Sequence, residues 1–140
     1  FCILGRGQVK YQVTYVSDLV EGIYLASLRE QALGQAYILG GETCPTLEEL
    51  VRNIALACGV RPPRLHLPIK PFLWAGVLCE NICRPLGLEP PLFKRRFDIF
   101  LKNRCFSIEK ARMQLGYCPR VGLREGLSKT VSRMRQQGLL

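Results

Sequence analysis

The sequence is poor in metal-binding and redox motifs. It contains a single histidine, His66, and none of its seven cysteines belongs to a Cys-x-x-Cys pair. Structural zinc sites use four ligands that usually come in closely spaced pairs, so no standard zinc site can be assembled from this sequence. The simplest interpretation of the cysteines is that they are reduced thiols in a cytoplasmic protein.

The sequence also lacks an apolar run long enough to cross a membrane. Its most apolar segment spans residues 72–86, and the unbroken apolar stretch from Pro71 to Cys79 is only nine residues long. A membrane-spanning helix needs about 20 such residues. We expect a buried helix in this segment. The alternatives are peripheral contact with a membrane and a wall of an apolar pocket.

No internal repeat, low-complexity tract or linker divides the chain, so we expect a single unit over residues 1–140. A hydrophobic content of 48% and a charged content of 22% are ordinary for a soluble globular protein. The chain begins with Phe1 and runs directly into a strand-like stretch, which leads us to expect a piece of something longer.

Acidic residues are scarce in the last third. Basic and acidic residues balance at eight each through Phe93, whereas from Lys94 onward twelve basic residues face three acidic ones, so the whole net charge of +9 lies there. A basic surface can bind nucleic acid or a phosphate-bearing ligand. The interpretation that we favour is a pair of solvated helix faces.

Hydrophobic periodicity predicts an α/β arrangement with a parallel sheet. Extended or strand segments are expected at residues 1–4, 9–16, 36–39 and 65–67. The change of period at Ser17 predicts a helix capped by Ser17 or Asp18. The apolar stripe of this helix is expected to comprise Leu19, Val20, Ile23, Tyr24 and Leu28.

Two further helical regions carry clear end signals. Thr46 and Glu49 form a capping box that begins a helix, and Gly59 is expected to end it. In residues 106–140, Ser107 is expected to cap one helix and Gly116 to end it. A last helix follows, with an apolar stripe of Leu123, Leu127, Val131 and Met134. This C-terminal pair is a packing unit with no chemistry of its own.

The motifs in order resemble the C-terminal part of an extended short-chain dehydrogenase/reductase of the epimerase/dehydratase group. They are ILGRG, TYVSDLVEGIYLA, AYILGGE with a capping-box helix, and FSIEKARMQLGYCPRVGLREGLSKTV. The stretch KRRFDIFLKNRCFSIEKA is most similar to the 3β-hydroxysteroid-dehydrogenase-like branch. The resemblance covers essentially the whole chain. It implies the C-terminal portion of a Rossmann-type, doubly wound α/β fold, with the last sheet strands plus a mainly helical substrate lobe.

The resemblance also implies NAD or NADP as cofactor and a Tyr-x-x-x-Lys catalytic pair. No tyrosine in this sequence has a lysine four residues later. The stretch from Gly5 to Lys10 supplies two glycines of a dinucleotide fingerprint but has lysine in place of the third. We therefore expect the catalytic and cofactor-binding residues to lie before Phe1, and this chain to be inactive alone.

Two residues are candidates for substrate contact. In nucleotide-sugar members of the family, an arginine followed three residues later by aspartate holds the substrate pyrophosphate, and Arg95 with Asp98 matches that arrangement. Those members commonly carry a second phosphate-binding arginine before the YVxD strand, where this sequence has Tyr11. Together with the apolar segment 72–86, this difference favours a sterol-like or other apolar substrate.

The resulting expectation is the substrate lobe of an NAD(P)-dependent oxidoreductase that acts on a hydroxyl or carbonyl group. Its expected partners are a small-molecule substrate and the rest of its own Rossmann domain, with a homodimer and a membrane surface as further candidates. The alternatives are a nucleotide-sugar epimerase or dehydratase, a non-enzymatic scaffold of the same fold, and a basic nucleic-acid-binding module.

Overall fold

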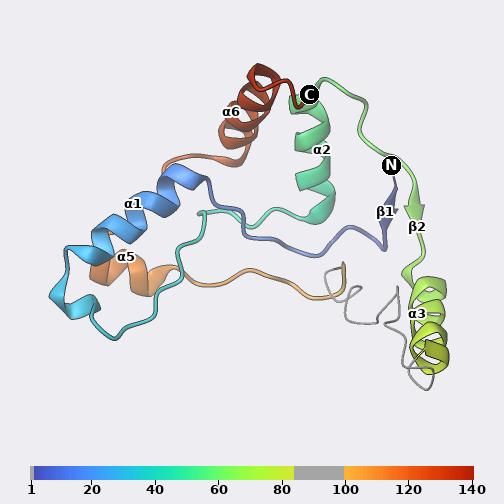
Figure 1. Ribbon diagram of the computed structural model, residues 1–140, viewed down its shortest axis with the longest axis horizontal. Helices are drawn as coiled ribbons and strands as arrows, with labels where there is room; N and C mark the ends of the chain where they lie inside the picture. The colour runs from blue at the N-terminus through green and yellow to red at the C-terminus, as the bar shows by residue number, and fades with distance from the viewer. Residues whose placement is uncertain (1, 84–99) are drawn as a thin grey trace.

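The computed structural model describes residues 2–83 and 100–140, with only the backbone of Glu80 and Ile82. The elements in chain order are β1 (Ile3–Leu4), α1 (Val16–Ser27), the 3₁₀ helix η1 (Glu30–Ala32), α2 (Leu47–Cys58), β2 (His66–Leu67), α3 (Ile69–Cys83), α5 (Glu109–Leu115) and α6 (Leu123–Gln136). They form three groups (Figure 1): α1 packs with η1 and α5, α2 packs with α6, and α3 follows the β1–β2 pair.

The two strands form a parallel pair. Ile3 is in register with His66, and Leu4 with Leu67. The expected strands at residues 1–4 and 65–67 are thereby confirmed for the residues that the structure describes. Because side chains alternate across a strand, Leu4 and Leu67 share one face of the pair, and Ile3 and His66 share the other.

An extended segment, Gly7–Gln12, connects distant parts of the chain through its backbone. On one side, the Tyr11 amide donates to Pro45 O at 2.9 Å, and the Leu47 and Glu48 amides donate to Val9 O and Gly7 O. On the other side, the Gln12 amide donates to Arg104 O at 2.9 Å, and the Arg104 amide donates to Lys10 O at 2.8 Å. The expected extended run is present, although its ladder consists of isolated bridges at Lys10 and Tyr11.

The same two flanking segments are joined covalently. Cys44 and Cys105 form a disulfide with a Cα–Cα distance of 6.0 Å across a sequence separation of 61. The expectation that all seven thiols are reduced is therefore wrong for this pair, which sequence spacing alone cannot identify. The other five cysteines are free.

Helix ends follow the sequence signals closely. The Thr46–Glu49 capping box is formed in both directions, and Gly59 and Gly116 adopt left-handed conformations with φ of 75°. The expected cap at Ser107 is displaced by one residue, because Ile108 is the N-cap position of α5. The Ser107 hydroxyl still accepts a hydrogen bond from the Glu109 amide at 3.3 Å.

Helix α1 begins earlier than predicted, with Tyr15 as its N-cap, so neither Ser17 nor Asp18 caps it. Asp18 is instead buried, with 3% of its surface exposed. Its Oδ2 accepts a hydrogen bond from the Val121 amide at 3.0 Å. The carboxylate therefore ties the first turn of α1 to the loop before α6.

The side of α1 that packs inward is the opposite of the predicted one. Gly22 is buried against Leu39 and Tyr117, next to the core formed by Ile108, Ala111, Leu115 and Tyr117. The predicted apolar stripe is exposed. Together with the exposed Val16 it forms what we call the α1 apolar face: Val16, Leu19, Val20, Ile23, Tyr24 and Leu28.

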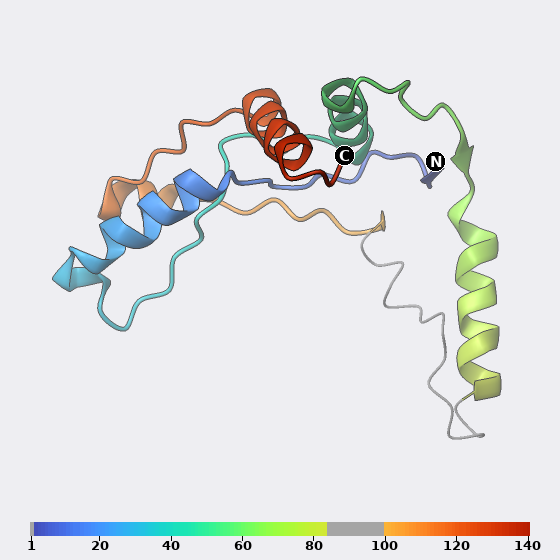
Figure 2. The ribbon, with the colours of Figure 1, turned by 45° about the horizontal axis from the view of Figure 1, so that its top comes forward.

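Two other predictions differ from the structure. Residues 36–39 do not form a strand, since Leu39 O accepts from the Thr14 hydroxyl at 3.4 Å and Gly41 O from the Gln12 side chain at 2.9 Å in place of a backbone ladder. Helix α3 extends away from the other helices (Figure 2), and Trp74 is 78% exposed, so the expected buried helix is an exposed one. None of the helices in the described part of the chain is long and apolar enough to cross a membrane.

We predict that Gly22→Ala destabilises the protein by about 1–2 kcal/mol. An added Cβ would lie 2.8 Å from a Leu39 methyl carbon and 3.0 Å from the Tyr117 ring, and this overpacking outweighs the roughly 1 kcal/mol gain in helix propensity. Urea unfolding measures the change. Gly122→Ser is the control, because nothing lies within 4 Å of an added Cβ there. Equal midpoints for both variants would show that Gly22 is not tightly packed.

Candidate functional site: an apolar cavity beside the strand pair

An apolar cavity of about 370 Å³ lies against one face of the β1–β2 pair. It is lined by Cys2, Leu4, Leu47, Val51, Leu67, Phe72 and Phe100. None of the described residues that line it is charged, so this part of the lining can accept an apolar body but offers no countercharge to a phosphate or carboxylate. A cavity of this kind is suited to burying part of an apolar small molecule.

Local sequence patterns explain why these side chains converge. Leu4 and Leu67 are in register on neighbouring strands, so they project to the same face. Leu47 and Val51 are four residues apart in α2 and therefore lie on one side of that helix. Phe72 comes from the first turn of α3. The capping box fixes the residue at which α2 begins, and thereby which of its residues face the strand pair.

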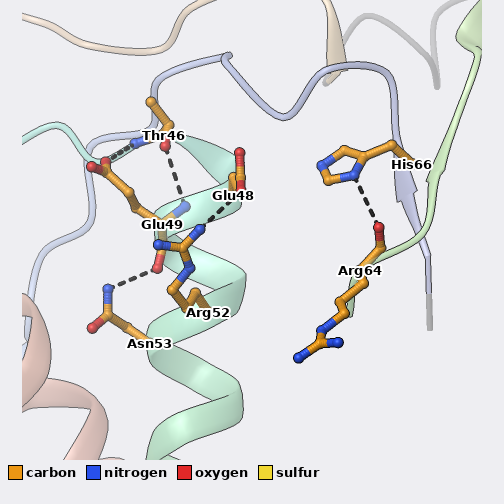
Figure 3. A network of polar contacts seen from close by, with 7 residues as sticks. All are labelled: Thr46, Glu48, Glu49, Arg52, Asn53, Arg64 and His66. Carbon is orange, nitrogen blue, oxygen red and sulfur yellow. Dashed lines mark hydrogen bonds and ion pairs between the residues drawn. The ribbon is translucent and has the colours of Figure 1, made fainter. Parts of the chain in front are cut away.

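The opposite face of the strand pair is polar. Ile3, Arg52, Arg64 and His66 belong to the lining of a second hollow of about 290 Å³. In Figure 3, Arg52 is directed toward Glu48, with which it forms an ion pair at 2.9 Å, and His66 Nδ1 lies 3.3 Å from Arg64 O. Because Arg52 is already paired and His66 is exposed, this face is a solvated surface.

Of the two residues predicted to contact substrate, the structure describes only Tyr11. Tyr11 is partly buried in the extended segment Gly7–Gln12 and is absent from the cavity lining. Burial raises the pKa of the Tyr11 phenol above its ordinary value, and the positive charge of Arg104 partly opposes the shift. Arg95 lies outside the described residues, so its role stays a prediction.

Six of the basic side chains that the structure describes in the last third have partners within the protein. Lys110 donates to Gln35 and to Ala36 O and lies 4.8 Å from the centre of the Tyr37 ring. Further basic residues pair with acidic or polar groups: Arg112 with Glu42, Arg120 with Glu21, Arg124 with Asn53, Lys129 with Glu125, and Arg135 with Cys58 O. These contacts favour the solvated-face interpretation over a nucleic-acid surface.

The described residues do not form a dinucleotide site. Gly5 and Gly7 both have positive φ, of 78° and 65°, but an extended segment follows them where a phosphate-binding helix would have to begin. Gly7 instead allows the close approach of α2, since an added Cβ would lie 3.1 Å from Glu48 Cβ. This glycine stretch therefore does not fit the phosphates of NAD or NADP. Nor do three potential metal ligands cluster anywhere in the part that the structure describes.

Comparison with known proteins agrees with the order of motifs. The chain is 30% identical over 145 residues to the decarboxylating sterol-4-alpha-carboxylate 3-dehydrogenase ERG26 of Saccharomyces cerevisiae, a match that covers 91% of this chain and 42% of that protein. It is 31% identical over 134 residues to the 2-alkyl-3-oxoalkanoate reductase of Stenotrophomonas maltophilia, with 91% and 40% covered. No family model matches.

Solved structures give the same result. The crystal structure of gox2253 matches with a TM-score of 0.79 and 29% identity, over 99% of this chain and 40% of that one. The epimerase Mth375 of Methanothermobacter thermautotrophicus matches with a TM-score of 0.69 and 25% identity, over 98% and 33%. The chain belongs to the extended short-chain dehydrogenases/reductases.

Within this family, the chain corresponds to the C-terminal portion of the Rossmann-type fold. It spans about two-fifths of the length of the yeast and Stenotrophomonas relatives. The UDP-glucuronic acid 4-epimerase of Bacillus cereus, solved in complex with NAD, shares the fold at 19% identity and a TM-score of 0.63, over 97% of this chain and 34% of that one.

Reasoning from the sequence did not identify the members of the cavity, apart from suggesting that segment 72–86 could form a pocket wall. Phe72 bears out that suggestion. The available signal was the apolar character of residues 1–4 and 65–67, which indicated strands but not that they pair with each other.

The raised pKa of Tyr11 predicts a pH dependence of stability. A raised pKa means that the folded state favours the neutral phenol. This contribution is fully present below the ordinary tyrosine pKa of about 10 and is lost as the pH rises through the raised value. Tyr11→Phe should therefore lose less stability than the wild type between about pH 9 and pH 11. Unfolding by urea across this range tests it, with Tyr24→Phe, whose ring is 61% exposed, as control. Equal slopes for Tyr11→Phe and wild type would contradict the assignment.

Proposed function

We propose that this chain forms the substrate lobe of an NAD(P)-dependent oxidoreductase that acts on a hydroxyl or carbonyl group of a sterol-like or other apolar substrate. The observation that carries the proposal is the apolar character of all the described residues that line the cavity between β1, β2, α2 and α3. Its support from the relatives is that the yeast and Arabidopsis thaliana matches, both at 30% identity, are named as sterol or 3beta-hydroxysteroid dehydrogenases.

In this proposal the chain's own residues bind and orient the substrate. Leu4, Leu67 and Phe72 bury the apolar body and exclude water from it, which contributes roughly 25 cal/mol for each Å² of apolar surface removed from water. Hydride transfer belongs to the nicotinamide cofactor, and the residues that hold it and move the proton are expected outside this chain. Tyr11 and Arg95 stay the predicted polar contacts to the substrate.

A nucleotide-sugar epimerase or dehydratase is the main alternative. Its sequence support is the Arg95–Asp98 arrangement, and several solved structures of the same fold are UDP-sugar epimerases. The cavity argues against it, since the described part of its lining carries no charged group. An epimerase or dehydratase of this kind converts UDP-sugars, whereas the proposed oxidoreductase does not, so one substrate panel distinguishes the two functions.

A second part of the proposal concerns the α1 apolar face. Six apolar side chains of one helix are exposed there, which is unusual for a folded surface because large apolar patches mark interaction sites. We assign this face to the rest of the chain's own Rossmann domain, because the relatives are more than twice as long as this chain. Peripheral membrane contact through residues 72–86 and a homodimer stay predictions, although the exposed Trp74 is compatible with the former.

The proposed substrate class is tested with the full-length native protein that contains this chain. It is assayed with NAD⁺ or NADP⁺ and a panel of 3β-hydroxysterols, medium-chain alcohols and UDP-sugars. We expect nicotinamide reduction with the apolar alcohols. Phe72→Ala removes roughly 60 Å² of contact, which is worth about 1.5 kcal/mol and so about a tenfold rise in KM. His66→Ala, on the opposite face of the strand pair, should leave KM unchanged. Turnover of UDP-sugars alone, or equal KM values for Phe72→Ala and the wild type, would overturn the proposed substrate class.

The assignment of the α1 apolar face predicts that Ile23→Glu destabilises the native protein by about 2 kcal/mol or more, because an unpaired carboxylate is then buried. Met113→Glu is the matched control, since Met113 is an exposed apolar residue on α5, outside this face. Thermal unfolding of the native protein measures both. An effect of Ile23→Glu no larger than that of the control would mean that solvent covers this face in the native protein.

A further inference from the structure

The disulfide between Cys44 and Cys105 lies directly beside the backbone contacts of Tyr11 and Gln12. Pro45 O, one residue after Cys44, accepts from the Tyr11 amide, and Arg104 O, one residue before Cys105, accepts from the Gln12 amide. The bond therefore joins the two segments that flank the extended segment Gly7–Gln12, which carries Tyr11. The Cα–Cα distance of 6.0 Å is within the usual range for a disulfide.

A second connection holds the same segments without any covalent bond. The Gln12 side chain donates to Gly41 O at 2.9 Å and accepts from the Phe106 amide at 3.1 Å. These contacts do not involve the cysteines, so we expect them to keep the two segments close after reduction. The thiols consequently remain within reach of each other, which is the condition for re-forming the bond.

The pair is also accessible. Cys105 is exposed and Cys44 is partly buried, so a small disulfide can reach the sulfur of Cys105 first. Cys118 and Cys2 are also exposed, but both are free. Accessibility alone therefore does not distinguish Cys105 from the other exposed cysteines. What distinguishes it is that it lies next to Cys44, with which it can form a disulfide.

We infer that Cys44 and Cys105 form a reversible redox clamp on the Tyr11–Gln12 segment. A low-molecular-weight disulfide such as glutathione disulfide is the oxidant. The Cys105 thiolate attacks one of its sulfurs and releases one glutathione thiolate, and the Cys44 thiolate then attacks the Cys105 sulfur and releases the second. Two protein thiols lose two protons and two electrons in total, and one glutathione disulfide becomes two glutathione molecules.

The clamp has a consequence for substrate binding that rests on the proposed function. Tyr11 is a predicted substrate contact, and its backbone is held by the residues next to the two cysteines. Oxidation fixes this segment, whereas reduction leaves it held by hydrogen bonds alone. The redox state of Cys44 and Cys105 thus determines how rigidly the backbone of Tyr11 is held.

The experiment measures the thiols and the backbone in the native protein. Samples are equilibrated in glutathione buffers from fully reduced to fully oxidised, and differential alkylation with mass spectrometry follows each cysteine. Cys44 and Cys105 should change state together at one glutathione ratio, while Cys118 does not follow them. Alkylation of both cysteines at every ratio, or pairing of either one with another cysteine, would overturn the proposal.

Hydrogen exchange then tests whether the bond acts as a clamp. The amides of Tyr11, Gln12 and Arg104 should exchange roughly tenfold faster or more after reduction, because local opening no longer has to work against a closed loop. Cys44→Ser/Cys105→Ser should exchange at the fast rate in both buffers, and Cys118→Ser should behave as the wild type. Unchanged exchange despite disulfide formation would reject the clamp. The measurement needs no substrate, so it stands apart from the test of the proposed function.

Discussion

The extended segment Gly7–Gln12 is the constraint on which the rest of the structure depends. Its backbone is hydrogen-bonded on one side to the start of α2 and on the other to residues that precede α5. A single strand of the chain thus fixes the positions of two helical regions more than 50 residues apart in sequence. The disulfide between Cys44 and Cys105 joins the same flanks, and closing a loop of this size removes about 4 kcal/mol of unfolded-chain entropy in the simplest model. The cavity depends on this arrangement, since Leu47 and Val51 belong to the helix that Gly7 and Val9 hold in place.

Features that depend on a few neighbouring residues could be predicted from the sequence. The capping box of Thr46 and Glu49 and the glycine ends at Gly59 and Gly116 are formed as expected, because each is determined within about one turn of helix. The stripe of α6 is also correct, with Val131 buried against the α2 side. The fold class could be predicted from the family resemblance, because the order of motifs is a property of the whole chain.

Features that depend on distant partners could not be predicted in the same way. The pairing of β1 with β2 and the disulfide each join residues about 60 apart, and no spacing rule selects them from the alternatives. The lining of the cavity comes from five separate stretches for the same reason. In α1 the helical period was predicted correctly, but the side of the helix that packs inward was not. Helical spacing shows only that one side is apolar. Gly22, on the other side, packs inward because a residue without a side chain allows Leu39 and Tyr117 to approach.

The exposed face of α1 and the missing strand at residues 36–39 have a common physical cause. A short apolar run is a strand only when neighbouring strands satisfy its backbone, and here side chains of Gln12 and Thr14 take the place of such neighbours. Leu39 of that run contacts the inner side of α1, so the helix and the run belong to one layer. Neither the backbone of residues 36–39 nor the α1 apolar face, which lies on the other side of the helix from Leu39, is covered by another of the described elements.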